Sequence, residues 1–193
     1  MSTPHRPAVF LDRDDTLVWN VPYLGDPAGV RLIPGVPEAL AALIGAGFEL
    51  FIVSNQSGIG RGRITHAQLE AVHAEVLKQI VHPVRAAYHS FGDPTLRGTP
   101  DSHLHLTTRK PSPLLVHRAA REFGLDLARS FFVGDRLGDV LCGRNAGCRS
   151  VLVRTGENGK EWPMAERFAD FAADTLGEVA AWIVSESAKD SRK

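Results

Sequence analysis

Three aspartates stand close together at the end of an apolar run near the start of the chain. In "AVFLDRDDTLVW", residues 8–19, Asp12, Asp14 and Asp15 follow directly after four apolar residues. Asp12 and Asp14 are two positions apart, so in extended chain their side chains point to the same side. Such a pair can hold a hard cation or divide the roles of nucleophile and general acid/base. An acidic turn on the surface explains this stretch alone equally well.

A second acidic stretch lies in the carboxyl half of the chain. In "VGDRLGDV", residues 133–140, Asp135 and Asp139 are four positions apart, which places both side chains on one face of a helix. Aspartates at a helix start are also ordinary caps and partners of the helix dipole. This stretch therefore predicts either further functional carboxylates or a helix cap.

Groups that suit a phosphate stand in two more stretches. "SNQSGIGRG", residues 54–62, offers the hydroxyl of Ser54, the amide of Asn55 and flexible backbone, and a phosphate needs several such donors. The glycines in it do not fit the dinucleotide-binding pattern. "TRKPS" brings Arg109 and Lys110 before a proline. Lys110 is a candidate to place positive charge on a phosphoryl group, although a solvated basic pair is the simpler interpretation of that stretch alone.

The elements that must position these residues alternate along the chain. Short apolar runs predict strands, and apolar residues three and four positions apart predict helices. Thr65 and Gln68 form a capping box that opens one of the helices. Strands are expected at 8–11, 49–54, 84–88, 130–135 and 150–155, and helices at 37–48, after residue 65, at 113–124 and at 176–186.

This alternation predicts an α/β fold with a doubly wound, mostly parallel sheet, a three-layer architecture of the Rossmann type. Ligands of such sheets bind at the carboxyl ends of the strands. Asp12, Ser54 and Asp135 each stand at the end of a predicted strand. Their convergence on one edge of the sheet is the main sequence evidence for a functional site.

We interpret residues 1–193 as one domain, with a core over about 8–186 and a polar tail at 187–193. Residues 89–110 show no clear periodicity, and loops of that length are uncommon unless they are functional or disordered. We interpret them as a loop insert that serves as a lid or specificity element. No large cap domain is expected.

Composition narrows the classes of function. The chain has 22 Lys and Arg against 22 Asp and Glu, which argues against a broad basic surface for nucleic acid. No apolar run reaches membrane-spanning length, and the start of the chain lacks the apolar centre of a signal peptide. Two cysteines, Cys142 and Cys148, imply no disulfide framework. We therefore expect a cytoplasmic enzyme, monomeric, with a small phosphorylated metabolite as its partner and neither nucleic acid nor membrane.

Taken together and in order, the four stretches resemble the four motifs of the haloacid dehalogenase (HAD) superfamily. The resemblance covers roughly residues 8–155. Within the superfamily, the chain is most similar to the histidinol-phosphatase-like branch. The Asn-Gln-Ser-Gly and Arg-Lys-Pro sequences are the features most specific to that branch. The stretches that carry it are "FLDRDDTL", "VSNQSGIGRG", "RKPSPLL" and "VGDRLGDV".

The resemblance implies a role for each motif residue. Asp12 is the expected nucleophile, which forms an aspartyl-phosphate, and Asp14 protonates the leaving oxygen and later activates water. Mg²⁺ is the expected cofactor, held by Asp12, Asp135 and the backbone carbonyl of Asp14, while Asp139 supports the metal shell or Lys110. The expected phosphate- and substrate-binding residues are Thr16, Ser54, Asn55, Arg109, Lys110 and Arg136.

The expected reaction is the hydrolysis of a phosphomonoester on a small sugar. Heptose 1,7-bisphosphate, losing its 7-phosphate, fits the resemblance best, and histidinol phosphate or another sugar phosphate is the alternative. The second phosphate of a bisphosphate substrate is hypothesised to reach Arg61, Arg63 or Arg136. A polynucleotide 3′-phosphatase fits the neutral charge less well. A non-catalytic phosphate-binding module is the competing class.

Two features depart from the branch. Its long loop usually holds a structural zinc through cysteines, but this loop has none, so zinc is expected to be absent. His89, His103 and His105 remain in the loop as a less favoured zinc site. Asp15 stands where the branch typically has glycine, and we expect it to serve a turn, a cap contact or the polarity around the site.

Overall fold

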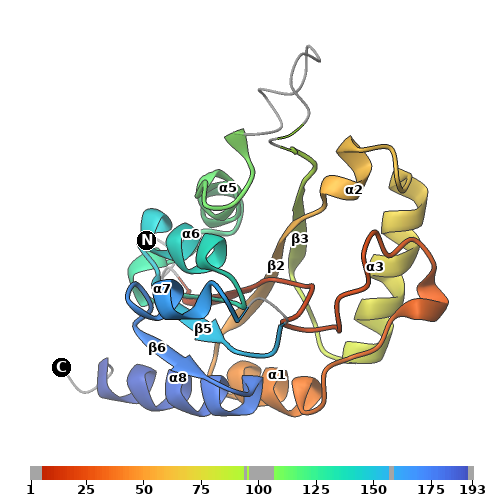
Figure 1. The fold of residues 1–193 in the computed structure, drawn as a ribbon. Helices are drawn as coiled ribbons and strands as arrows, with labels where there is room; N and C mark the ends of the chain where they lie inside the picture. Colours follow the sequence, from red (N-terminus) through yellow and green to blue (C-terminus); the bar gives the residue numbers. More distant parts are fainter. Residues whose placement is uncertain (1–5, 94, 96–106, 157–158, 191–193) are drawn as a thin grey trace.

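One parallel sheet forms the centre of the molecule (Figure 1). The computed structural model describes residues 6–93, 95, 107–156 and 159–190. Within them the strand order is β3-β2-β1-β4-β5-β6, and all neighbours are parallel. The strands are β1 (Ala8–Leu11), β2 (Glu49–Asn55), β3 (Ala86–Ser90), β4 (Phe131–Gly134), β5 (Arg149–Val153) and β6 (Phe171–Ala173).

Strand β1 lies between β2 and β4, and this arrangement brings the motif stretches together. Leu11, the last residue of β1, pairs with Ile52 of β2 and Val133 of β4. Every residue of β1 and β4 is buried, because both faces of a parallel sheet are covered by helices. The residues that follow these apolar strands therefore emerge side by side at one edge of the sheet.

Within the described residues, three helices pack on each face of the sheet. On one face lie α1 (Val36–Gly45), α3 (His66–Ile80) and α8 (Leu176–Asp190), with α1 and α8 side by side along the lower face in Figure 1. On the other lie α5 (Leu114–Phe123), α6 (Leu137–Ala146) and α7 (Trp162–Glu166). Val9 of β1 packs into the first layer and Phe10 into the second, as alternation along a strand requires.

The predicted doubly wound, three-layer α/β fold is confirmed, and several element bounds differ from the prediction. The helix predicted over 37–48 ends at Gly45, because Gly47 has a left-handed φ of 89° that ends the helix. The capping box of Thr65 and Gln68 is present. Strand β6 and helix α7 were not predicted, since three and five residues carry too little periodicity. The four-residue helix α2 (Ser57–Gly60) also escaped prediction.

Two other segments differ from their expected limits. The polar tail was expected from residue 187, but α8 continues through Asp190, and an ion pair of 2.6 Å between Lys189 and Glu186 lies on its last turn. Residues 89 and 90 of the expected insert belong to β3. Much of the remaining insert lies outside the described residues, so its role as a lid stays a prediction. Across the described ranges, no helix has the length and apolar character that crossing a membrane requires.

Val81, the C-cap of α3, generates a prediction about stability. Its φ is 55°, a left-handed conformation that is costly for a β-branched residue, and the residue is 74% exposed. Val81→Gly should therefore raise the free energy of unfolding by about 1 kcal/mol, measured by urea unfolding. Val81→Ala, which keeps a Cβ at the same φ, should give a smaller gain. A loss of stability in the glycine variant would contradict strain at this cap.

Candidate active site

A cavity of about 450 Å³ opens at the carboxyl ends of the central strands. Its walls come from segments far apart in the sequence. Asp12 follows β1, Ser54 and Asn55 end β2, and Lys110 comes from the loop before α5. The sheet topology explains this convergence, since β1, β2 and β4 are neighbours and end at the same edge.

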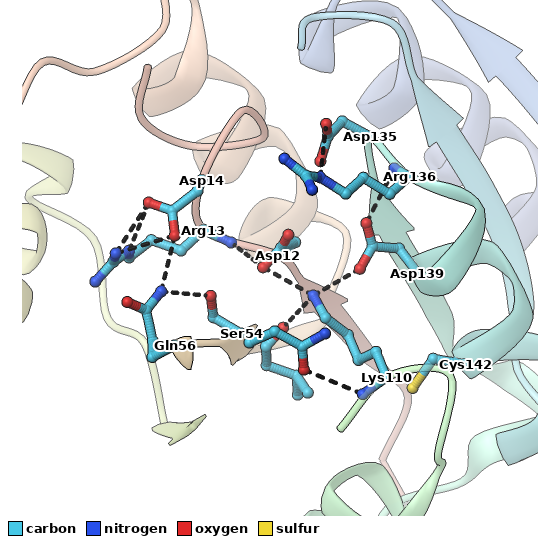
Figure 2. A network of polar contacts seen from close by, with 12 residues as sticks. Asp12, Arg13, Asp14, Ser54, Gln56, Lys110, Asp135, Arg136, Asp139 and Cys142 are labelled. Atoms are coloured by element: carbon cyan, nitrogen blue, oxygen red, sulfur yellow. Dashed lines mark hydrogen bonds and ion pairs between the residues drawn. The ribbon is translucent and has the colours of Figure 1, made fainter. Parts of the chain in front are cut away.

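The ammonium group of Lys110 lies at the centre of the site, as Figure 2 shows. Its Nζ lies 2.8 Å from Asp12 Oδ1 and 2.6 Å from Asp139 Oδ1, and it donates to the carbonyl of Val53 at 2.9 Å. The side chains of Lys110, Asp12 and Asp139 are all nearly inaccessible to solvent. Burial disfavours the charged ammonium, but the two carboxylates outweigh it and hold the pKa of Lys110 above its ordinary value. Lys110 is therefore a fixed positive charge.

Backbone contacts hold Lys110 in place. Asn55 Oδ1 accepts a hydrogen bond of 3.1 Å from the Lys110 backbone N–H, and the following peptide bond to Pro111 is cis. From α6, Asn145 Nδ2 donates to the Pro111 carbonyl at 2.9 Å and Cys142 Sγ donates to the Ser112 carbonyl at 3.2 Å. The lysine is thus tied to the end of β2 on one side and to α6 on the other.

Asp12, Asp135 and Asp139 bring three carboxylates together. Each offers an oxygen within 4.8 Å of the other two, and all three residues are buried. Burial and the neighbouring Asp12 raise the pKa of Asp139 above its ordinary value against the opposing effect of Lys110. Gly156 lies against this cluster, where a Cβ would meet Asp135 Oδ2 at 2.4 Å. Clustered carboxylate oxygens are the ligands that suit a hard divalent cation.

Asp14 points away from this cluster. Its carboxylate accepts three hydrogen bonds from the Arg13 guanidinium, at 2.9 to 3.1 Å, and one from Gln56 Nε2 at 2.8 Å. Gln56 Nε2 also donates to Ser54 Oγ at 2.9 Å (Figure 2). Sequence analysis did not single out Arg13 or Gln56. The sequence features that could have indicated them are the position of Arg13 between two aspartates and the position of Gln56 within the stretch already assigned to phosphate binding.

Most of the predicted site residues meet at this cavity. Those that line it are Asp12, Asp14, Ser54, Asn55, Arg109, Lys110, Arg136 and Asp139. Thr16 does not line it: the residue is fully buried in the turn over residues 13–18, where Leu17 and Val18 both donate to the Arg13 carbonyl. A phosphate contact by Thr16 therefore stays a prediction.

Asp15 and the predicted arginines also have definite places. Asp15 has a left-handed φ of 58°, and its Oδ1 accepts from the Asn20 backbone N–H at 3.1 Å. Such a conformation favours glycine and tolerates aspartate, which accounts for the residue type at this position. Arg61 is paired with Asp93 and donates to Tyr23, and neither Arg61 nor the exposed Arg63 lines the cavity. Three arginines were proposed to bind a second phosphate, and of these Arg136 alone lines the cavity.

His89 lies on β3 with its ring edge-on to that of His73, 5.5 Å between centroids. Burial, reinforced by His73 and Arg13, lowers the pKa of His89 to about 3, and so the ring is neutral. His103 and His105 lie outside the described residues. The expectation about zinc in this loop therefore stays a prediction.

A parallel α/β sheet with carboxylates, a buried lysine and hydroxyl donors at its carboxyl edge defines the HAD-like class. Residues 107–179 match the HAD-hydrolase-like family. The D-glycero-beta-D-manno-heptose-1,7-bisphosphate 7-phosphatase of Mesorhizobium japonicum is 38% identical over 80% of this chain and 72% of its own length. The D-glycero-D-manno-heptose-1,7-bisphosphate 7-phosphatase of Thermosynechococcus vestitus is 35% identical over 95% of this chain and 98% of its own. The chain belongs to the HAD-like hydrolase family that contains these 7-phosphatases.

Solved structures agree with this assignment. The D,D-heptose 1,7-bisphosphate phosphatase of B. bronchiseptica, complexed with magnesium and phosphate, superposes with a TM-score of 0.80 at 27% identity. The match covers 93% of this chain and 99% of that one. The two chains therefore share the whole fold.

Gly134 and Gly138 provide a test of how tightly the site is packed. A Cβ on Gly134, at the end of β4, would lie 2.4 Å from the Cβ of Asp139, whereas one on Gly138 would meet nothing closer than 3.8 Å. Gly134→Ala should lower the free energy of unfolding by about 1–3 kcal/mol, because it displaces a buried, ion-paired carboxylate. Gly138→Ala is the matched control and should change it by no more than about 0.5 kcal/mol. Equal effects in urea unfolding would contradict this packing.

Proposed function

We propose that this protein is a phosphomonoesterase that removes the 7-phosphate of D-glycero-D-manno-heptose 1,7-bisphosphate through an aspartyl-phosphate on Asp12. The observation that carries the proposal is the position of Lys110, whose buried ammonium lies 2.8 Å from the Asp12 carboxylate. An anionic nucleophile and a phosphate dianion repel each other, and a fixed positive charge beside the nucleophile offsets that repulsion. The names of the relatives support the choice of substrate.

Each reacting group has its own role in the proposed reaction. Asp12 attacks phosphorus, and the bond from phosphorus to the sugar oxygen breaks. Asp14 gives a proton to that oxygen and then takes one from the water that hydrolyses the aspartyl-phosphate. Ser54 and Lys110 donate to the phosphoryl oxygens. Holding these groups in line contributes much of the rate enhancement, because phosphoryl transfer depends mostly on positioning and on charge stabilisation.

The donor set fits Mg²⁺. Asp12, Asp135 and the backbone carbonyl of Asp14 would hold the ion, which supplies neutralisation of charge on the phosphoryl oxygens when bound. Asp139 is less available, because its Oδ1 pairs with Lys110 and its Oδ2 accepts from the Arg136 backbone N–H at 3.0 Å. Its proposed role is to hold the lysine. The similar protein of B. bronchiseptica was crystallised with magnesium.

Replacing the nucleophile tests the mechanism. Asp12→Asn should lower kcat for an aryl phosphate by at least about 1,000-fold, because an amide cannot form the acyl-phosphate. Circular dichroism should show an unchanged fold. Asp174→Asn, which alters an exposed aspartate paired with Arg154, is the matched control and should keep full activity. Undiminished turnover by the Asp12 variant would overturn this mechanism.

Removing the metal tests the cofactor. Chelation with EDTA should abolish turnover by the wild-type protein, and added Mg²⁺ should restore it, since the buried carboxylates then regain a counter-charge. Thermal unfolding with and without Mg²⁺ gives a second readout, because an ion that binds only the folded state raises the midpoint. Full activity in excess EDTA would contradict a magnesium enzyme.

A panel of phosphorylated metabolites tests the substrate. It should contain heptose 1,7-bisphosphate, the corresponding 7-monophosphate, histidinol phosphate and a 3′-phosphorylated oligonucleotide. The proposal expects the highest kcat/KM with heptose 1,7-bisphosphate. A higher value with histidinol phosphate would assign the chain to the other activity, and binding without hydrolysis across the panel would favour a non-catalytic module.

Arg136 is the proposed contact for the second phosphate. It lines the cavity with a half-exposed side chain, and its Nε lies 3.7 Å from a carboxylate oxygen of Asp135. Arg136→Gln should raise KM for the bisphosphate about tenfold, the effect of losing roughly 1.4 kcal/mol of binding, and KM for the monophosphate far less. Arg63→Gln, outside the cavity, is the control and should change neither. Equal rises for both substrates would contradict this role.

A further inference from the structure

Gln56 connects two residues of the site through one amide group. The residue follows β2 directly, is nearly buried, and its backbone N–H donates to the Ser90 carbonyl of β3 at 2.7 Å. Its Nε2 donates to Asp14 Oδ2 at 2.8 Å and to Ser54 Oγ at 2.9 Å. Both hydrogens of the amide NH₂ are therefore used, one on each partner.

The Asp14 carboxylate fixes which way this amide faces. Arg13 donates to both oxygens of Asp14, as a guanidinium does to a carboxylate, and a carboxylate only accepts hydrogen bonds. If the amide were rotated by 180°, its oxygen would face a carboxylate oxygen at 2.8 Å, and the two would repel. While Asp14 is ionised, the state in which both of its oxygens accept from Arg13, the NH₂ group faces Asp14, and the same NH₂ group then reaches Ser54.

Ser54 is consequently an acceptor toward Gln56. A hydroxyl has one hydrogen, and that hydrogen cannot lie on the side where another N–H already donates. It is left to point toward a different acceptor, and the cavity that Ser54 lines is where the phosphoryl group is proposed to bind. The terminal oxygens of a phosphate dianion only accept hydrogen bonds, so a hydroxyl oriented in this way matches them.

We propose that Gln56 is a positioning residue that fixes the Ser54 hydroxyl as a donor to the phosphoryl group. In this arrangement Arg13 donates hydrogen bonds to Asp14, and Gln56 donates to both Asp14 and Ser54. The Ser54 hydroxyl then donates to the phosphate. This inference rests on the proposed function, and it adds a residue that acts through Ser54. Gln56 itself has only its carbonyl oxygen left, an acceptor that a phosphate would repel, so a direct contact with the phosphoryl group is disfavoured.

A double-mutant cycle with inorganic phosphate as the probe tests this role. Phosphate affinity is measured in saturating Mg²⁺ by titration calorimetry, so that turnover is not required. Gln56→Met keeps the length of the side chain and removes the amide. It should weaken phosphate binding about tenfold, because the Ser54 hydroxyl regains free rotation and its charge-assisted hydrogen bond becomes weaker. In the Ser54→Ala background, Gln56→Met should have no further effect.

Two further variants sharpen the result. Gln56→Glu keeps the shape but places a carboxylate beside Asp14, and it should weaken phosphate binding more than Gln56→Met does. Gln79→Met, on α3 outside the cavity, makes the same chemical change elsewhere and should leave phosphate affinity unchanged. Aryl phosphate kinetics should follow, with KM rising as phosphate binding weakens. If Gln56→Met fails to fold, a cycle of Gln56→Leu with Ser54→Ala carries the same comparison, because leucine also removes the amide without adding a charge.

The outcomes separate this inference from the function on which it rests. Equal weakening by Gln56→Met in both backgrounds would show that Gln56 acts independently of Ser54 and would overturn the inference, as would unchanged affinity in the single variant. A wild-type protein that binds phosphate but hydrolyses no phosphomonoester would overturn the proposed function and leave the cycle valid. Absence of phosphate binding by the wild-type protein would overturn both.

Discussion

The burial of one ammonium group constrains the whole site. A lysine out of reach of solvent needs opposite charges, and Lys110 finds them in Asp12 at 2.8 Å and Asp139 at 2.6 Å. These three residues come from a strand end, a loop and the first turn of α6, so the ion pairs form only when the sheet order places β1 beside β4. Because removing one partner would leave a buried charge uncompensated, the fold and the chemistry depend on the same contact.

Close packing around the carboxylates follows from that constraint. Gly134 leaves room for Asp139, and Gly156 leaves room for Asp135, in both cases where a Cβ would lie 2.4 Å from the neighbouring side chain. Trp162 donates from Nε1 to the Asp135 carbonyl at 3.2 Å, which holds the first residue of α7 against the site. The carboxylates are thus confined by backbone that approaches to contact distance, and this keeps their oxygens together in spite of their repulsion.

The alternation of apolar runs and helical patterns along the chain was sufficient to predict the sheet. Asp12 and Lys110 were assigned to the site because four stretches, taken together and in order, resemble the motifs of one superfamily, since neither stretch alone was decisive. The burial of Thr16 could not be predicted, because it depends on a turn in which Asp15 adopts a left-handed φ of 58°. Arg13 and Gln56 went unnoticed because their significance lies in the direction of hydrogen bonds between segments that only the fold brings together.

The direction of donation divides the site into two parts that share one residue. On the side of Asp135 and Asp139, carboxylate oxygens converge and the surroundings favour a cation. On the side of Ser54 and Lys110, Gln56 Nε2 donates to Ser54 Oγ and Lys110 Nζ carries the positive charge that an anion requires. Asp12 belongs to both, since its carboxylate completes the acidic cluster while its Oδ1 accepts from Lys110 and from the Arg13 backbone N–H at 2.7 Å. An anionic nucleophile can approach an anionic phosphate only at such a boundary, where each charge already faces its opposite.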